Sequence, residues 1–507
     1  MRVENSIRNF KYSMVSQFIT TFMSFFSRTI FIKILGEEYL GINGLFSNIL
    51  TILSLADMGI STVIIYSMYK PLAENNNNKI KELMNMYKKV YSFIALSVLV
   101  MGLCIMPFLE YFIKDVPNIP NLEYIYLLYL LNSVVSYLCA YKISIINADQ
   151  KGYIVTYKQQ LISFISIIIM TLVLIITRNF LMYLIIQIGF SVFSNIYLSK
   201  LAEKMYPFIR NTTGYKLSKN EINLFKKDVF AMMLHKIGGV VVNGTDNLIM
   251  SSMIGITYVG IYSNYLLIIN IIKRILLQFF DAISASIGNL VIEKDNKYVY
   301  DIFKRIYFLN FWIYSFCSIC LFILLNPFIK LWLNDNYIFK NSIVFLICLI
   351  FFIDGMRQTV QRFRNALGIF VNDKYRPLIE AILNLLISVI CSVKLGISGI
   401  FIGTIVSMIF SAIIEVYILY KYGFEKSIKS FIYIYFKYIV ITIVALTVTI
   451  IVNSNLGDIS IFDFFIKGAF TIINCNLIFL ICTFRTKEFK YFKELILQRV
   501  SNKILRI

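Results

Sequence analysis

The stretch Ser27-Arg-Thr-Ile-Phe-Ile-Lys-Ile-Leu-Gly-Glu-Glu-Tyr-Leu-Gly-Ile42 decides the fold, because its second part recurs later in the chain. Leu35-Gly-x-x-Tyr-Leu-Gly-Ile42 returns as Ile254-Gly-x-x-Tyr-Val-Gly-Ile261, and both copies join two long apolar segments. Weaker matches at nearly the same displacement pair Pro107-Phe108 with Pro327-Phe328, Asn147-Ala148 with Asn365-Ala366, and Leu198-x-Lys200 with Leu419-x-Lys421. Four matches in one order predict two related halves.

The composition is that of a membrane protein. Of 507 residues, 58% are hydrophobic and only 15% are charged, whereas soluble domains carry about 25% charged residues. The net charge of +21 does not indicate a nucleic-acid partner, because the Lys and Arg residues gather in alternate loops between apolar segments. The cysteines lie in apolar runs and are expected to be core residues. Because His235 is the only histidine, catalysis that needs several imidazole ligands is excluded. We expect a protein that is not an enzyme, with no metal site and no cofactor apart from a possible coupling Na⁺ or H⁺.

Apolar segments of bilayer-spanning length predict about fourteen helices. In lipid every backbone polar group needs a partner, so runs of this length without alternation form helices. The first set lies near 12–32, 40–66, 90–113, 122–147, 159–177 and 180–198, the second near 229–254, 257–285, 305–328, 342–365, 376–393 and 397–420, and two more near 431–452 and 462–483. The expected fold is an all-α integral membrane protein with two pseudo-symmetric six-helix halves and two C-terminal helices.

These spans divide the chain into four parts. We expect an N-terminal six-helix lobe (1–200), a cytoplasmic linker (201–228), a C-terminal six-helix lobe (229–422), and a last part (423–507) with two helices and a basic cytoplasmic tail. The positive-inside rule places both termini in the cytoplasm, and the expected place of the chain is the plasma membrane. Because an even number of helices separates the repeats, both halves enter the membrane in the same direction, and a substrate site is expected between them near the midplane.

Polar side chains form stripes at spacings of three and four, each on one face of an expected helix. A charge at bilayer depth costs about 3 kcal/mol or more unless it faces water, a partner or the bundle interior. The stripes are therefore expected to line a polar cavity, unless their uncharged members hold helices together. The candidate substrate-binding residues are Arg28, Arg274, Lys273, Arg357, Gln17, Ser24 and Asn243. The candidate counter-charges, or sites for a coupling Na⁺ or H⁺, are Asp57, Asp246, Asp281, Asp354, Glu380 and Glu415.

Arg28 is the strongest single candidate, because a guanidinium can hold a phosphate through two parallel hydrogen bonds. Its place near the outer end of the first helix also allows it to extend to the membrane surface. Lys273 and Arg274 either line the cavity or mark the cytoplasmic end of their helix. Asp354 and Arg357, three residues apart, are close enough to pair with each other.

Two segments give the chain a family resemblance, Asn365-Ala-Leu-Gly-Ile-Phe-Val-Asn-Asp-Lys-Tyr-Arg-Pro-Leu-Ile-Glu380 and Lys394-Leu-Gly-Ile-Ser-Gly-Ile-Phe-Ile-Gly-Thr-Ile-Val-Ser407. Together with the six-helix repeat, they resemble the Wzx-like polysaccharide flippases of the MOP exporter superfamily, which also holds MATE exporters and MurJ-type flippases. The resemblance implies a MATE-like fold. It also implies export of an undecaprenyl-pyrophosphate-linked oligosaccharide, such as a capsule or O-antigen repeat unit, from the inner to the outer leaflet by alternating access. The family's cationic cavity is matched by Arg28, Arg274 and Arg357.

Other functions stay open on the sequence. A lipid II-type flippase would look similar, and a MATE-like exporter of cations would prefer an acidic cavity without Arg28. A membrane enzyme, such as a glycan polymerase, would usually need a sizeable outer loop, and the outer loops here are short. A scaffold for glycan synthases would not explain the charges within the helices. No G-x-x-x-x-G-K-[ST] motif occurs, so transport would draw on gradients or the membrane potential. The expected partners are a lipid-linked glycan, the lipid bilayer and glycan-assembling enzymes.

Overall fold

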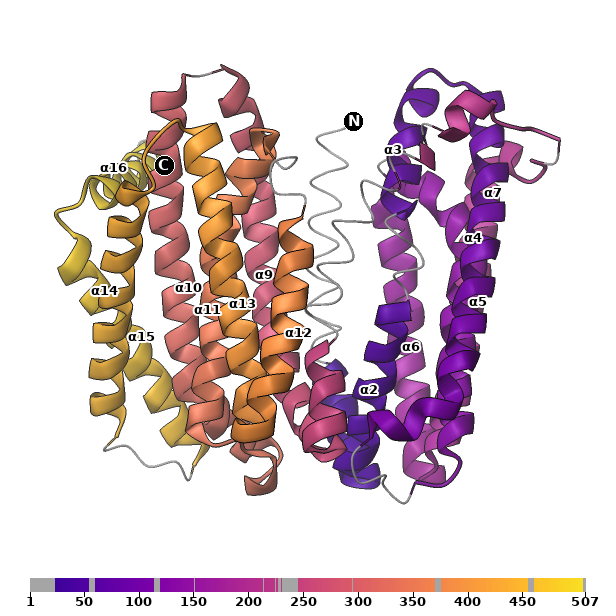
Figure 1. Cartoon of the computed structure of the whole chain (residues 1–507), viewed down its shortest axis with the longest axis horizontal. Coiled ribbons are helices and arrows are strands. Elements are labelled where there is room, and N and C mark those ends of the chain that lie inside the picture. The colour runs from indigo at the N-terminus through magenta and orange to yellow at the C-terminus, as the bar shows by residue number, and fades with distance from the viewer. Residues whose placement is uncertain are drawn as a thin grey trace. The chain divides into compact units, whose positions relative to one another are not determined.

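The computed structural model describes residues 23–53, 60–113, 119–149, 151–212, 214–223, 225–226, 229, 245–293, 295–369, 375–454 and 460–504. These residues are almost all helical, and no strand occurs among them, which confirms the all-α class. Their contacts divide the chain into two units, Met1–Ser263 and Asn264–Ile507. Figure 1 shows the helices of both units.

Ten helices in the described part of the chain are long and apolar enough to cross a membrane. Leu122–Leu138 and Tyr141–Ala148 form a pair bent by 51°, which counts as an eleventh candidate if the two helices make one span. The chain is therefore a polytopic membrane protein. The predicted number of fourteen is not confirmed, because the spans expected near 12–32, 40–66 and 229–254 each lie partly outside the described residues.

The first unit is a bundle in which α5 packs against α3, α4 and α7. Tyr126 of α5 donates a hydrogen bond to the carbonyl oxygen of Gly102 on α4 at 3.0 Å. Helix starts are capped locally, since the Asn179 side chain accepts hydrogen bonds from the first backbone amides of α7. The elements are α2 (Glu37–Leu53), α3 (Ile60–Ala73), α4 (Asn77–Ile105), η2 (Met106–Phe112), α5 (Leu122–Ala148), α6 (Gly152–Thr177), α7 (Phe180–Met205), η3 (Pro207–Ile209), η4 (Met250–Ile254) and the start of α9 (Ile256–Glu293).

The segment after α7, expected to be a linker, is attached to α4. Asn85 donates to the carbonyl oxygen of Tyr215 at 2.6 Å, and the Lys81 ammonium lies 4.9 Å from the Tyr215 ring centroid. Lys79 pairs with Glu221 at 2.5 Å. Hydrogen bonds from Lys79 and Ser218 lower the pKa of the Glu221 carboxyl below its usual value. The carboxylate therefore stays ionised, and the attachment persists, throughout the neutral pH range.

The second unit holds the rest of α9 and the C-terminal helices. In it α10 packs against α11 and α15, and α14 packs against α15 (Figure 1). The expected basic tail is itself helical as α16. The elements are α10 (Asn296–Trp332), η5 (Asp335–Tyr337), α11 (Asn341–Ala366), α12 (Arg376–Leu395), α13 (Ile397–Ile418), η7 (Leu419–Gly423), α14 (Lys429–Asn453), α15 (Ile461–Thr483) and α16 (Lys487–Ile504).

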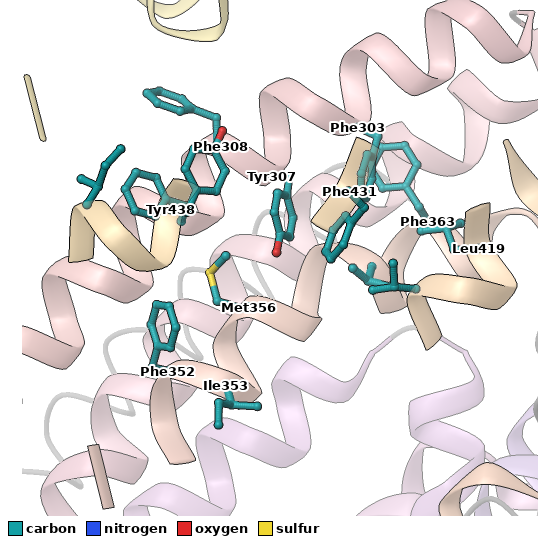
Figure 2. Packing of buried hydrophobic residues seen from close by; sticks show 14 of the residues in the cluster. Phe303, Tyr307, Phe308, Phe352, Ile353, Met356, Phe363, Leu419, Phe431 and Tyr438 are labelled. Atoms are coloured by element: carbon teal, nitrogen blue, oxygen red, sulfur yellow. The ribbon is translucent and has the colours of Figure 1, made fainter. Parts of the chain in front are cut away.

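An aromatic core joins α10, α11 and α14 within the second unit (Figure 2). The Tyr307 ring lies 5.1 Å from that of Phe431, and Phe311 stacks on Tyr438 at 4.1 Å. Large buried rings contribute much apolar area for little conformational entropy. This core holds α14 and α15 to α10 and α11, so these two C-terminal helices are part of the second unit rather than an appendage.

Candidate functional site

The repeated motif starts a helix in both halves. Gly36 follows the helical residues 23–35 with a φ of +87°, and α2 begins at the next residue. Gly255 follows η4 with a φ of +147°, and α9 begins directly after it. A positive φ is strained for residues with a Cβ, so glycine is suited to both breaks. The prediction that the motif joins two apolar helices holds for the described residues.

Arg28 lies half-buried on the helical segment 23–35, with its guanidinium directed at α9. Its Nη2 donates a hydrogen bond to the hydroxyl of Ser263, and that hydroxyl donates to the carbonyl oxygen of Gly260 at 2.6 Å. The phenol of Tyr183 hydrogen-bonds Ser27 and lies close to the guanidinium. The cation therefore contacts a hydroxyl group of α9 and lies near a phenol inside the first unit.

An aromatic wall stands beside this arginine, one turn away. The Phe31 ring lies 5.6 Å from Phe180 and 5.5 Å from Tyr183, in edge-to-face arrangements. Thr171 of α6 donates to the Ser27 hydroxyl at 3.3 Å. The wall fixes the helix that carries Arg28, and the sequence had not singled out Tyr183, Ser263 or Thr171 for this place.

The other first-unit candidates are dispersed or not described. Ser24 is half-buried on the same helical segment as Arg28. Asp246 is 9% exposed and acts electrostatically on the buried Tyr262 of α9. Gln17, Asp57 and Asn243 lie outside the described residues, so they stay predictions.

In the second unit, α9 and α11 present a half-exposed charge pair. Lys273 pairs with Asp354 at 2.8 Å, while Arg274 is exposed. Lys273 lies in the middle of α9, but the apolar part of that 38-residue helix ends at Phe280, so the cavity and the cytoplasmic exit both stay predictions for this residue. Charges half-exposed at this depth must face water or a partner rather than lipid. The side chain of Asp281 lies outside the described residues.

Arg357 belongs to a buried ion network on α11, α12 and α13. Its guanidinium bonds both oxygens of Glu380, at 2.7 and 3.1 Å, and reaches Glu415 at 3.0 Å. Arg376 bonds Glu380 and Glu415, each at 2.9 Å, and Arg364 lies 3.6 Å from Glu415. Glu415 is fully buried and the other members are less than 9% exposed.

This network corrects the suggested pairing of Asp354 with Arg357, because each of them has a partner on another helix. In this network Glu380 and Glu415 are the counter-charges of buried arginines. Arg364 and Arg376 were missed by the sequence reasoning. The signal for Arg376 was a series of polar residues spaced four apart, all of them buried on α12. The series is Arg376, Glu380, Asn384, Ser388 and Ser392.

An apolar pocket of about 740 Å³ lies within the second unit beside this network. Its rim includes Ile413 of α13 and Ile432 of α14, which are 58% and 56% exposed. Its inner wall includes Tyr307 and Arg357, which are buried. Exposed isoleucines on membrane-spanning helices face lipid, so the pocket opens toward the bilayer and suits a hydrocarbon chain.

Comparisons with known proteins agree with this architecture. Residues 6–284 match the sequence family described as "Polysaccharide biosynthesis protein". The structure is similar to one described as lipid II flippase MurJ in the inward closed conformation, with a TM-score of 0.69 and 15% identity, covering 96% of this chain and 100% of that chain. It is also similar to a mutant of the Vibrio cholerae MATE transporter VcmN, with a TM-score of 0.56 and 13% identity, covering 83% and 97%.

A third similar structure is an inward-facing multidrug resistance MATE family transporter of the MOP superfamily. Its TM-score is 0.54 at 13% identity, covering 78% of this chain and 92% of that chain. No curated protein sequence matches the chain. At these identities the structural likeness shows the fold, which is the MATE-like fold that the sequence resemblance implied.

Proposed function

Because the chain belongs to the polysaccharide biosynthesis protein family, we propose that it moves a polyprenyl-pyrophosphate-linked oligosaccharide from the inner to the outer leaflet of the plasma membrane by alternating access. The similar structures described as a flippase and as transporters support movement of a substrate across the membrane rather than its synthesis. Undecaprenol is the expected lipid carrier.

The observation that carries this proposal is Arg28. The residue is half-buried on a helical segment of the first unit, and its guanidinium donates a hydrogen bond to the hydroxyl of Ser263. An arginine offers five donors in a planar fork, which fits the oxygens of a pyrophosphate. Because the site is only partly exposed to water, a charge-assisted hydrogen bond there is stronger than the same bond on the open surface.

The membrane potential suits an anionic substrate. Moving two negative charges outward from a negative interior is favourable by about 4.6 kcal/mol per 100 mV. Lys273 and Arg274 would then offer further positive charge along α9, while the network around Arg357 would keep the second lobe rigid. Whether Na⁺ or H⁺ is also moved would be decided by transport at zero potential with and without each gradient.

The apolar pocket of the second unit is the place that best fits part of the lipid's hydrocarbon tail. Replacing Ile413 at its rim by Trp would fill the entrance, and we expect transport of a long-chain lipid-linked glycan to fall about three- to tenfold. A water-soluble short-chain analogue should be affected less, because it does not need the pocket. The matched control is Ile390→Trp, at an exposed position of α12 that does not line the pocket. Equal losses for long and short chains would contradict the assignment.

The function is tested directly with purified protein in liposomes. The probe is a fluorescent undecaprenyl-pyrophosphate oligosaccharide, and its arrival in the outer leaflet is read from quenching by a membrane-impermeant reductant. We expect faster movement with the protein than in empty liposomes, and little movement of a cationic dye. Preferential movement of lipid II would favour the lipid II-type alternative, which the fold similarity to MurJ also supports. Dye movement alone would refute the proposal in favour of a MATE-like exporter.

A further inference from the structure

The two copies of the repeated motif touch each other through equivalent glycines. A Cβ added to Gly260 of α9 would lie 2.5 Å from the carbonyl oxygen of Glu37 and 3.2 Å from the backbone nitrogen of Gly41. A Cβ added to Gly41 of α2 would in turn overlap the carbonyl oxygen of Ile256. Both glycines are buried. The starts of α2 and α9 therefore cross with their backbones in direct contact, which no larger residue permits.

The same face of α9 also reaches Arg28. Ile256, Val259, Gly260 and Ser263 follow spacings of three and four, so they lie on one side of the helix. Val259 is fully buried, and its Cγ1 lies 3.2 Å from the position of a Cβ on Gly44. Ser263 accepts the hydrogen bond from Arg28. Two helix turns of α9 thus combine an apolar backbone crossing with a polar contact to the proposed phosphate-binding arginine.

The boundary between the two units lies inside this helix, directly after Ser263. Residues up to Ser263 pack with the first unit, and α9 continues without a break into the second. A movement of the first turns of α9 within the first unit therefore has to detach them from α2. Detachment requires separating the glycine crossing and breaking the Arg28–Ser263 hydrogen bond.

We propose that the Gly41–Gly260 crossing and the Arg28–Ser263 hydrogen bond form a latch that the substrate itself releases. This inference rests on the proposed function of Arg28. A pyrophosphate bound to Arg28 competes with the Ser263 hydroxyl for the same guanidinium, and a charged acceptor binds it more strongly than a neutral one. The latch then loses the Arg28–Ser263 hydrogen bond, and the start of α9 separates from α2. A ligand shifts a conformational equilibrium only through such differential contacts.

The latch is tested by the accessibility of a buried reporter. In full-length protein with its native cysteines replaced, Val259→Cys places one thiol within the crossing. Its labelling by a membrane-impermeant maleimide is measured in liposomes, with and without undecaprenyl pyrophosphate as the probe. We expect slow labelling without the probe and faster labelling with it. Adding Ser263→Ala should raise the labelling rate about tenfold without any probe, because one hydrogen bond to a charged group is removed.

Ser252→Ala is the matched control, since Ser252 bonds only to carbonyl oxygens of its own helix in the contacts described, Leu248 and Ile249. It should leave labelling unchanged. A second variant, Gly260→Leu, wedges the crossing apart and should give fast labelling that the probe no longer alters. Equal labelling of the reporter protein with and without Ser263→Ala would overturn the latch, whatever the transport assay shows. Faster labelling by Ser263→Ala with no response to the probe would keep the latch and refute phosphate binding by Arg28.

Discussion

Replacing Arg28 by Ala is expected to reduce transport of the lipid-linked oligosaccharide by about 10- to 100-fold, the loss that follows from removing one or two charge-assisted hydrogen bonds. Arg28→Lys keeps the charge but not the planar fork, so it should restore only part of the rate. The measurement is the initial rate of glycan arrival in the outer leaflet, in liposomes with equal amounts of folded protein.

The control for this prediction is Arg178→Ala. Arg178 is an exposed arginine between α6 and α7 of the same unit, so its removal tests loss of a cation without loss of the half-buried site. Its transport rate should match the unmodified protein. If Arg28→Ala transports normally, the phosphate-binding role fails, and the cationic site has to be sought around Lys273 and Arg274. Full recovery by lysine would mean that charge alone matters at this position.

Glu415→Gln is expected to cause the largest loss of stability. The substitution leaves Arg357, Arg364 and Arg376 facing a neutral amide inside the second unit, and breaking a buried ion pair typically costs about 3–5 kcal/mol. We expect a lower midpoint of thermal unfolding in detergent and a smaller yield of folded protein. The reporter is the unfolding transition of the purified full chain, followed by the reactivity of its buried cysteines.

The matched control is Glu74→Gln, which also removes a carboxylate from an ion pair. Glu74 lies 3.9 Å from Lys70, and the two side chains are 55% and 84% exposed. An exposed pair of this kind contributes about 0–1 kcal/mol, so the unfolding midpoint should barely move. An unfolding midpoint for Glu415→Gln equal to that of the control would contradict the structural role of the network.

Arg357→Met combined with Glu380→Met should lower the free energy of unfolding by less than the sum of the two single changes, because the pair is removed together.

Much of the architecture follows from the sequence because lipid constrains the backbone so strongly. Apolar runs of spanning length have to be helices, and ten spans are found among the described residues. The boundaries differ at some helix ends, since α4 begins at Asn77 rather than near residue 90. Polar, charged turns there continue the helix beyond the hydrocarbon core, and a hydropathy pattern does not register them.

The functional residues likewise divide into features that the sequence predicts and pairings that only the structure shows. The sequence by itself determined that Arg28 lies in an apolar helical segment beside a repeated glycine motif, and that charges of both signs are spread over several helices. Helical periodicity assigns residues to faces, but it does not say which faces meet. Only the tertiary structure decided that Arg357 pairs with Glu380 and Glu415 rather than with Asp354. A buried charge takes the partner that satisfies most of its hydrogen bonds, and here those partners stand on other helices.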